Sequence, residues 1–412
     1  MAQTETAQAT NFFLDGNFAP VSDERDAQDM PVLGEIPKDL AGHFLRVGPN
    51  PAHIFNEAAY HTFDGDGMIH AMTFNEGSAH YRNRFVQTEG YKLEQAHGGW
   101  LYKGMNSMMD PTPSELPSGA PKNKNLANTA FAYHNKTLYA LHEPSQPTII
   151  DLPELATQGA TNFDGKLKHP FTAHPKVDHS SGEMMTFGYA FQAPFVTYSV
   201  ISASGELVHS TPITISKPVF MHDFAVTEKY SLFLDFPITL DIERAIAGGP
   251  ALGFEPEHGS RIGVIPRFGS DQDVRWFEVK TGSVVHTANA WDDGDDVVLQ
   301  ASRSKTSDIA GAGLNAENLE ETQGQLYEWR INLTTGVVTE RTLSTVYCDF
   351  TRVNDLHACH PTRYVYAAAF NPERPFSFDG VMKFDNETQA TTTFHYGANR
   401  FGGEAVFAPR VG

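Results

Sequence analysis

Cysteine and positive charge are both scarce in this chain of 412 residues. Its two cysteines, Cys348 and Cys359, are too few for a disulfide framework or a cysteine-based zinc site, and they indicate a reducing compartment. The 30 Lys and Arg residues stand against 50 Asp and Glu residues, which gives a net charge of −20. Because such a surface repels phosphate backbones, we expect no nucleic-acid partner.

Long apolar segments are missing as well. No stretch approaches the roughly 18 apolar residues that a membrane-spanning helix requires, and residues 1–11 are too polar for a secretion signal. We therefore expect a cytoplasmic protein. A hydrophobic fraction of 40% with 19% charged residues is nevertheless typical of a folded chain that builds a large core.

Short apolar runs bounded by turn residues are abundant along the whole chain. They are rich in β-branched and aromatic residues and predict strands. Examples are Thr137–Leu141, Phe195–Val200, Tyr230–Leu234, Val297–Gln300 and Tyr364–Ala369. Helical periodicity is rare, and the best candidates, Ile238–Ala247 and Ala316–Thr322, look like insertions between strands.

The pattern indicates an all-β protein in one domain, residues 1–412, because no linker or change of composition divides the chain. A chain with so many strands must protect their edges, and a propeller is one way to do so. Seven blades would take roughly 59 residues each. A pair of β-sandwiches explains the same pattern, so composition and periodicity leave both architectures open.

Histidine is frequent, with 18 in the chain, and three lie in unusual local surroundings: His174, His222 and His286. The intervals of 48 and 64 residues are too long for one local metal-binding motif. They would place one imidazole on each of several strands or blades that meet at a common axis. Neutral imidazoles suit iron, copper, zinc or nickel, and a site built from histidine alone leaves positions open for a small molecule.

The segments around these histidines resemble the carotenoid cleavage oxygenases, which include the retinal pigment epithelium isomerase and the lignostilbene dioxygenases. The resemblance extends over nearly the whole chain, and the motifs occur in the family's order. They are Asn17–Val21, Gly34–Gly42, Phe44–Pro51, His61–Met68, Asn83–Val86, Asn125–Thr129, Phe220–Phe224, Arg261–Arg267, His286–Trp291 and Gly402–Pro409.

This resemblance implies a seven-bladed β-propeller with short helical insertions and long loops over the metal face. It also implies one non-haem ferrous iron, Fe(2+), on the axis, held by four histidines without a carboxylate ligand. By motif match, His174, His222 and His286 correspond to the first three ligands. No side-chain acid or base is expected to be catalytic beyond the metal centre.

The family also uses carboxylates that accept hydrogen bonds from the free ring nitrogens of the ligands. Glu143 and Glu404 match two of these positions. The third match is Asp349, where relatives usually have Glu. Because Asp is one methylene shorter, the corresponding hydrogen bond is expected to be longer or bridged by water.

The fourth ligand cannot be assigned by motif. In relatives, further strands and a histidine-bearing turn follow the segment that matches Glu404–Pro409, whereas this chain ends at Gly412. We therefore expect a C-terminally truncated form whose last blade is incomplete. The histidines near the end are His357, His360 and His395, and their use as a substitute ligand is a hypothesis that rests on proximity in sequence alone.

The reaction implied by the resemblance is cleavage of a conjugated carbon–carbon double bond by dioxygen, with two carbonyl products. The substrate is then an apolar polyene or a stilbene. Stilbene-cleaving relatives tend to carry a lysine where this chain has His142, which favours a carotenoid or apocarotenoid over a stilbene. Two other readings stay open, namely an isomerase that uses the same iron site and an inactive propeller that only binds a polyene or lipid. Peripheral membrane contact for substrate uptake is also left open.

Overall fold

The computed structural model describes residues 11–309, 319–371 and 377–409. Within these ranges the chain consists mainly of β-strands joined by turns, as the sequence predicts. Contacts divide it into two compact units. The first contains residues 11–133 and 137–161, and the second contains residues 134–136 and the described part of 162–409.

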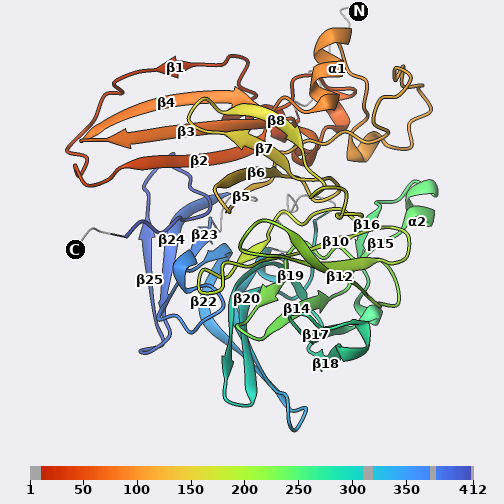
Figure 1. Ribbon diagram of the computed structural model, residues 1–412, viewed down its shortest axis with the longest axis vertical. Coiled ribbons are helices and arrows are strands. Elements are labelled where there is room, and N and C mark those ends of the chain that lie inside the picture. The colour runs from red at the N-terminus through yellow and green to blue at the C-terminus, as the bar shows by residue number, and fades with distance from the viewer. Residues whose placement is uncertain (1–10, 310–318, 372–376, 410–412) are drawn as a thin grey trace, which may run out of the picture. The chain divides into compact units, whose positions relative to one another are not determined.

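Two four-stranded sheets lie in the first unit, with strand orders β1-β4-β3-β2 and β5-β6-β7-β8 (Figure 1). Their strands are β1 (Asp26–Ala27), β2 (Gly42–Pro49), β3 (Gly67–Asn75), β4 (Ser78–Phe85), β5 (Ala130–His134), β6 (Thr137–Leu141), β7 (Thr148–Asp151) and β8 (Ala156–Ala160). One cluster of buried side chains joins the two sheets and includes Ile69 and Ala71 of β3, Leu138 of β6 and Ile150 of β7. The apolar face of each sheet is thus buried against the other.

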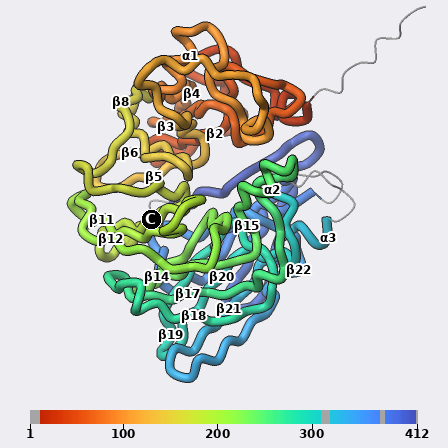
Figure 2. Tube along the Cα trace, turned by 90° about the vertical axis from the view of Figure 1, so that its right-hand side faces the viewer, coloured from red at the N-terminus to blue at the C-terminus, as the bar shows by residue number. Residues whose placement is uncertain are grey.

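Two further four-stranded sheets lie in the second unit, with orders β12-β11-β10-β9 and β13-β14-β17-β18 (Figure 2). Their strands are β9 (Lys176–Val177), β10 (Met184–Tyr189), β11 (Val196–Ile201), β12 (Leu207–Ile213), β13 (Ala225–Val226), β14 (Tyr230–Asp235), β17 (Ser260–Pro266) and β18 (Arg275–Val279). A two-stranded sheet, β15 (Ile238–Leu240) with β16 (Leu252–Phe254), is inserted between β14 and β17.

The rest of the second unit forms a seven-stranded sheet with strands in chain order. They are β19 (Ser283–Asp293), β20 (Asp296–Ser304), β21 (Gln325–Asn332), β22 (Val338–Arg352), β23 (Tyr364–Phe370), β24 (Phe378–Asp385) and β25 (Ala390–His395). The 15-residue β22 pairs with β21 through its first part and with β23 through its last part. The sheet therefore contains two four-stranded arrangements that share β22, and the described residues hold six such arrangements in all. The predicted number of seven blades stays a prediction.

Packing between neighbouring sheets fixes the strands that lead to the site. Phe187 and Tyr198 of the β9–β12 sheet share one buried cluster with Phe233 of β14. Leu232, on the opposite face of β14, belongs to a second cluster that contains Trp329 of β21. Because these side chains are fully buried, the β13–β18 sheet is held from both faces.

Helices are short and few in the described residues. The α-helices are α1 (Glu89–His97), α2 (Ile242–Ile246) and α3 (Leu319–Thr322). Single 3-10 turns are found at Phe12–Leu14, Gly16–Phe18, Glu57–Ala59, Thr62–Asp64, Met105–Ser107, Pro256–His258, Asp271–Asp273 and Asp355–His357. None of the described helices is long and apolar enough to cross a membrane.

The five strands predicted from short apolar runs are confirmed as β6, β11, β14, β20 and β23. The helix predicted over Ile238–Ala247 is wrong in its first part, because Ile238–Leu240 pair with β16 as β15. The helix starts only after Asp241, whose side chain accepts a hydrogen bond from the amide of Arg244. Of the second predicted helix, residues 316–318 lie outside the described ranges and Leu319–Thr322 form α3.

Candidate metal centre

Three histidines lie at or just before corresponding strands of three successive sheets. His174 precedes β9 by two residues, His222 precedes β13 by three, and His286 lies within β19. Each of these strands is the edge strand with which its sheet begins. The fold therefore brings together side chains that are 48 and 64 residues apart in the sequence.

The Nε2 atoms of the three rings converge. His222 Nε2 lies 2.9 Å from His174 Nε2 and 3.2 Å from His286 Nε2. The three nitrogens lie within 4.8 Å of one another and form the one group with metal-ligand geometry among the described residues. A first-row metal ion bound to two imidazoles at about 2.1 Å and at right angles would separate their nitrogens by about 3.0 Å. The donor set thus fits a transition-metal ion.

Asp349 of β22 fixes the orientation of the third ring. His286 Nδ1 lies 3.0 Å from Asp349 Oδ1, so the ring donates its Nδ1 hydrogen and directs the Nε2 lone pair toward the other two histidines. Burial lowers the pKa of His286, but the adjacent Asp349 carboxylate outweighs this effect and leaves the pKa above its ordinary value. The shorter Asp side chain reaches the ring directly in this structure.

β-bulges position both partners of this hydrogen bond. In β19, two residues between Val284 and Thr287 face a single residue of β20, and His286 is one of the two. In β22, one extra residue lies between Asp349 and Arg352. A bulge redirects a side chain without ending the strand, which explains how two regular strands present these groups to the same point.

His286 is buried, and His174 and His222 are half-buried. Burial, followed by the neighbouring imidazoles of His222 and His286, lowers the pKa of His174 well below its ordinary value, so this ring is neutral near pH 7. Phe220 stacks on His222 with 5.4 Å between ring centroids, and Phe350 packs against His286 at 4.8 Å. These contacts keep water away from the ring faces and restrict rotation of the rings.

Two threonines that sequence reasoning missed hold the backbone near the rings. Thr172 accepts a hydrogen bond from the amide of His174 at 3.0 Å and donates to the carbonyl of His222 at 3.4 Å. Thr351 makes a long hydrogen bond of 3.5 Å to the carbonyl of His286. Threonine is common in strands, so nothing in the sequence distinguishes these two from the others.

The structure places the charge of Glu404 near His286, where it helps to raise the pKa of that ring. Glu404 lies 3.2 Å from Arg352 Nη1, and Arg352 also binds Asp355. Glu143 is buried but belongs to the first unit, whereas the histidines belong to the second. The proposed roles of Glu143 and Glu404 therefore stay predictions.

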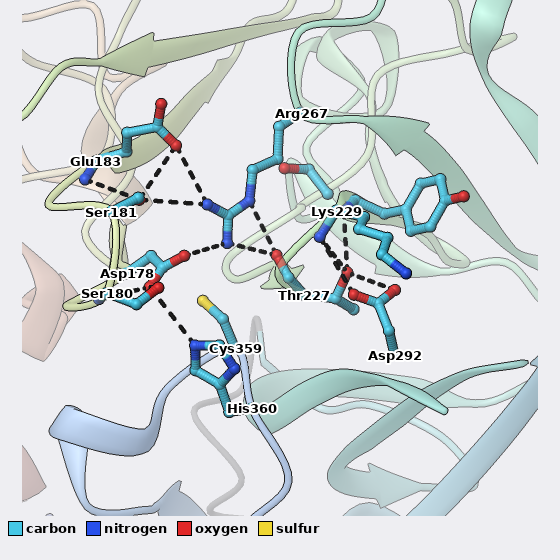
Figure 3. Close-up of polar contacts among 12 residues, drawn as sticks. Asp178, Ser180, Ser181, Glu183, Thr227, Lys229, Arg267, Asp292, Cys359 and His360 are labelled. Atoms are coloured by element: carbon cyan, nitrogen blue, oxygen red, sulfur yellow. Dashed lines mark hydrogen bonds and ion pairs between the residues drawn. The ribbon is translucent and has the colours of Figure 1, made fainter. Parts of the chain in front are cut away.

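The histidines near the C-terminal end lie elsewhere. His360 Nε2 is 3.7 Å from Asp178 Oδ1, within a cluster centred on Arg267 (Figure 3). His395 lies 3.6 Å from Asp379 and has a side chain that is 67% exposed. His357 is not among the converging rings either. Among the residues that the structure covers, none of the three supplies a fourth nitrogen.

Comparison with known proteins extends these observations. Residues 18–412 match the family described as retinal pigment epithelial membrane protein. The carotenoid 9,10(9',10')-cleavage dioxygenase of Crocus sativus is 38% identical over 97% of this chain and 78% of its own length. The crystal structure of Pseudomonas brassicacearum lignostilbene dioxygenase superposes with a TM-score of 0.84, at 29% identity, over 93% of this chain and 84% of that one. Cobalt-substituted Synechocystis ACO gives a TM-score of 0.82, at 28% identity, with 95% and 85% covered.

Fold and relatives together define this chain as an oxygenase with a β-propeller fold. Its second unit contains a three-histidine centre suited to a transition metal. The chain belongs to the carotenoid cleavage oxygenase family.

Proposed function

We propose that this chain is a non-haem iron dioxygenase that cleaves a conjugated double bond of a carotenoid or apocarotenoid with dioxygen, giving two carbonyl products. The observation that carries the proposal is the convergence of three imidazole Nε2 atoms, with His222 at 2.9 Å and 3.2 Å from the other two. The substrate class is supported by the similarity to the Crocus sativus enzyme, which is named for carotenoid cleavage.

His174, His222 and His286 would hold the ion through Nε2. When bound, a ferrous ion with neutral ligands retains its positive charge and supplies open positions at which dioxygen is activated beside an electron-rich alkene. Asp349 keeps the hydrogen of His286 on Nδ1, so that Nε2 stays free to bind. Burial keeps His174 neutral, and the rings of Phe220 and Phe350 exclude water from the imidazole faces. No proton transfer by a side chain is needed.

His142 supports the choice of a carotenoid over a stilbene. Its Nδ1 lies 3.3 Å from the amide of Leu126 and 3.0 Å from Ser145 Oγ, and burial lowers its pKa to about 3. The ring is therefore a neutral group at physiological pH. A phenolate oxygen is held better by a cation, such as the lysine of the stilbene-cleaving relatives, than by a neutral imidazole.

The test is reconstitution of the purified protein with Fe²⁺ under argon, followed by addition of oxygen and one substrate. An apocarotenal and a hydroxystilbene are supplied separately, and aldehyde products and oxygen uptake are measured. We expect aldehydes from the apocarotenal, and a His222→Ala variant that retains neither iron nor activity. If only the hydroxystilbene gives a product, the substrate is a stilbene and the proposed carotenoid substrate is wrong.

Stilbene cleavage is the second candidate, and the similarity to lignostilbene dioxygenase favours it. Conversion of a polyene under strict anaerobiosis would instead point to an isomerase. Iron content near zero after anaerobic reconstitution would leave a protein that only binds a polyene or lipid.

A further inference from the structure

Asp223, which directly follows His222, has contacts that neither the metal site nor the sequence motifs explain. Its side chain is almost completely buried, with 3% of the residue exposed. A carboxylate in such a position is stable only if all its acceptor positions are used. Both of its oxygens have partners, and those partners come from the strands that carry the other two histidines.

The Oδ1 atom of Asp223 forms an ion pair with a residue close to His174 in the sequence. Asp223 Oδ1 lies 2.7 Å from the Nζ atom of Lys176, which follows His174 by two residues in β9. The same oxygen accepts a hydrogen bond of 2.7 Å from the amide of Phe224. An ion pair thus connects the His222 segment to the β9–β12 sheet.

The Oδ2 atom of Asp223 accepts hydrogen bonds from the residue that follows His286. Asp223 Oδ2 accepts hydrogen bonds of 2.8 Å from both the amide and the hydroxyl of Thr287, the residue after His286 in β19. The same hydroxyl is 2.9 Å from the carbonyl of Phe224. One carboxylate is therefore bonded within two residues of each of the three imidazole-bearing positions.

We infer that Asp223 is a positioning residue that sets the spacing of the three imidazoles by joining the three sheets that supply them. This role rests on the proposed function, since it assumes that the three rings bind a metal ion. Asp223 touches none of the rings and acts through the backbone beside them. Because a preorganised ligand set binds an ion more tightly than a loose one, its loss should appear first in metal affinity.

Asp223→Asn is a sharp test because it preserves the shape of the side chain. All four partners of the carboxylate are donors, so the amide group of Asn would face either Lys176 or Thr287 with a donor of its own. The matched control is Asp235→Asn. Asp235 ends β14, is 1% exposed and accepts hydrogen bonds of 2.8 Å from His258 and Arg261, neither of which belongs to the histidine cluster.

The probe is Co²⁺ alone, added to the metal-free chain of 412 residues. Its dissociation constant is measured by competition with a chelator, the visible absorption spectrum reports ligand geometry, and melting is followed in parallel. For Asp223→Asn we expect affinity about 10- to 100-fold weaker and a changed spectrum. For Asp235→Asn we expect wild-type affinity and spectrum despite a lowered melting temperature.

Three gentler variants provide the answer if Asp223→Asn does not fold. Lys176→Met removes the ion pair, and Thr287→Val removes the hydroxyl but not the amide, so each should weaken Co²⁺ binding less than Asp223→Asn does. Thr287→Ser keeps the hydroxyl and should restore wild-type binding.

Three results would count against the role, and they are distinguishable. If the wild type binds Co²⁺ and the variants at Asp223, Lys176 and Thr287 bind it equally well, the positioning role fails and the metal centre stands. Equal weakening in Asp235→Asn would also overturn the role, because the effect would then follow general destabilisation. If the wild type itself binds no Co²⁺, the proposed metal centre fails and the positioning role fails with it.

Discussion

At the scale of single residues, burial and neighbouring acids together set the pKa of each histidine. His61 is 2% exposed, and desolvation lowers its pKa to about 4, while Nδ1 accepts a hydrogen bond from the amide of Phe63. His286 is similarly buried, yet its pKa is raised because Asp349 lies 3.0 Å away. The same side chain thus behaves oppositely depending on whether an acid faces it.

The neutral state of His61 predicts a specific response to acid. Its pKa of about 4 in the folded protein is below the ordinary 6.5, so the unfolded chain takes up the proton first as the pH falls. Stability associated with this group is complete above pH 6.5 and is lost between pH 6.5 and 4, by on the order of 3 kcal/mol. His61→Asn retains a capping oxygen but cannot titrate. We expect it to be less stable at pH 7, with a smaller loss between pH 7 and 4, in urea unfolding at several pH values. An equal slope in both proteins would contradict the assignment.

The second residue-scale prediction concerns substrate choice at His142. Replacing this neutral imidazole by lysine offers a cation to a phenolate, and a charge-assisted hydrogen bond contributes about 1.5 kcal/mol or more. His142→Lys should therefore raise the ratio of hydroxystilbene to apocarotenal cleavage about tenfold. The control is His142→Gln, which is neutral and should leave the ratio unchanged. If both variants raise the ratio equally, charge is not the cause and pocket size becomes the explanation.

At the scale of secondary-structure elements, the bulges decide how the site is assembled. Phe350, in the bulge of β22, has a φ angle of +52°, a left-handed conformation that costs an L-residue about 1–2 kcal/mol. Its ring contacts both His286 and Phe378. The strand therefore tolerates local backbone strain where it presents Asp349 to the metal centre.

Because of this conformation, we expect glycine to be a more stable replacement than alanine at position 350, which is the reverse of the usual order within a strand. Both Phe350→Gly and Phe350→Ala remove the ring, but only glycine adopts the left-handed conformation without strain. We expect the glycine variant to be more stable by about 1 kcal/mol in urea unfolding. At Thr339, a regularly paired position of the same strand, alanine should instead be the more stable replacement, by about 0.5–1 kcal/mol. If the alanine variant has the larger free energy of unfolding at both positions, the backbone at Phe350 is not strained.

The elements also show what can be predicted from sequence. Short apolar runs of β-branched and aromatic residues located β6 and β14 well, because strands that are buried on both faces are apolar along most of their length. The pattern failed for Ile238–Leu240, where pairing with β16 outweighed the apparent helical spacing. It also missed α1, whose signals are its caps, Thr88 at the start and Gly98 with a φ of +78° at the end. Caps are read from single residues, so they carry less weight than a repeated pattern.

At the scale of the whole molecule, the site is a product of topology. The spacing of His174, His222 and His286 allows one imidazole on each of several strands but does not by itself establish convergence, and the resemblance to a family gave these three of the 18 histidines their role as ligands. The structure brings them together because they lie within, or two or three residues before, the edge strands with which three successive sheets begin. The bulges that aim Asp349 and His286, and the contacts of Asp223, depend on strand register and have no local sequence signal.

A metal ion bound here would connect three sheets, which predicts a dependence of global stability on metal. Binding to the folded state alone stabilises it by about 2.7 kcal/mol when the free metal is at 100 times its dissociation constant. Adding Fe²⁺ under argon to the metal-free protein should therefore raise the melting temperature, by about 3 °C for a chain of this length. Mg²⁺, which prefers oxygen ligands, should have no effect. His395→Ala, a change at an exposed histidine outside the cluster, should retain the full increase, whereas His222→Ala should abolish it. An equal increase in both variants would mean that the metal stabilises the protein from some other site, and the three imidazoles would then lose their assignment as its ligands.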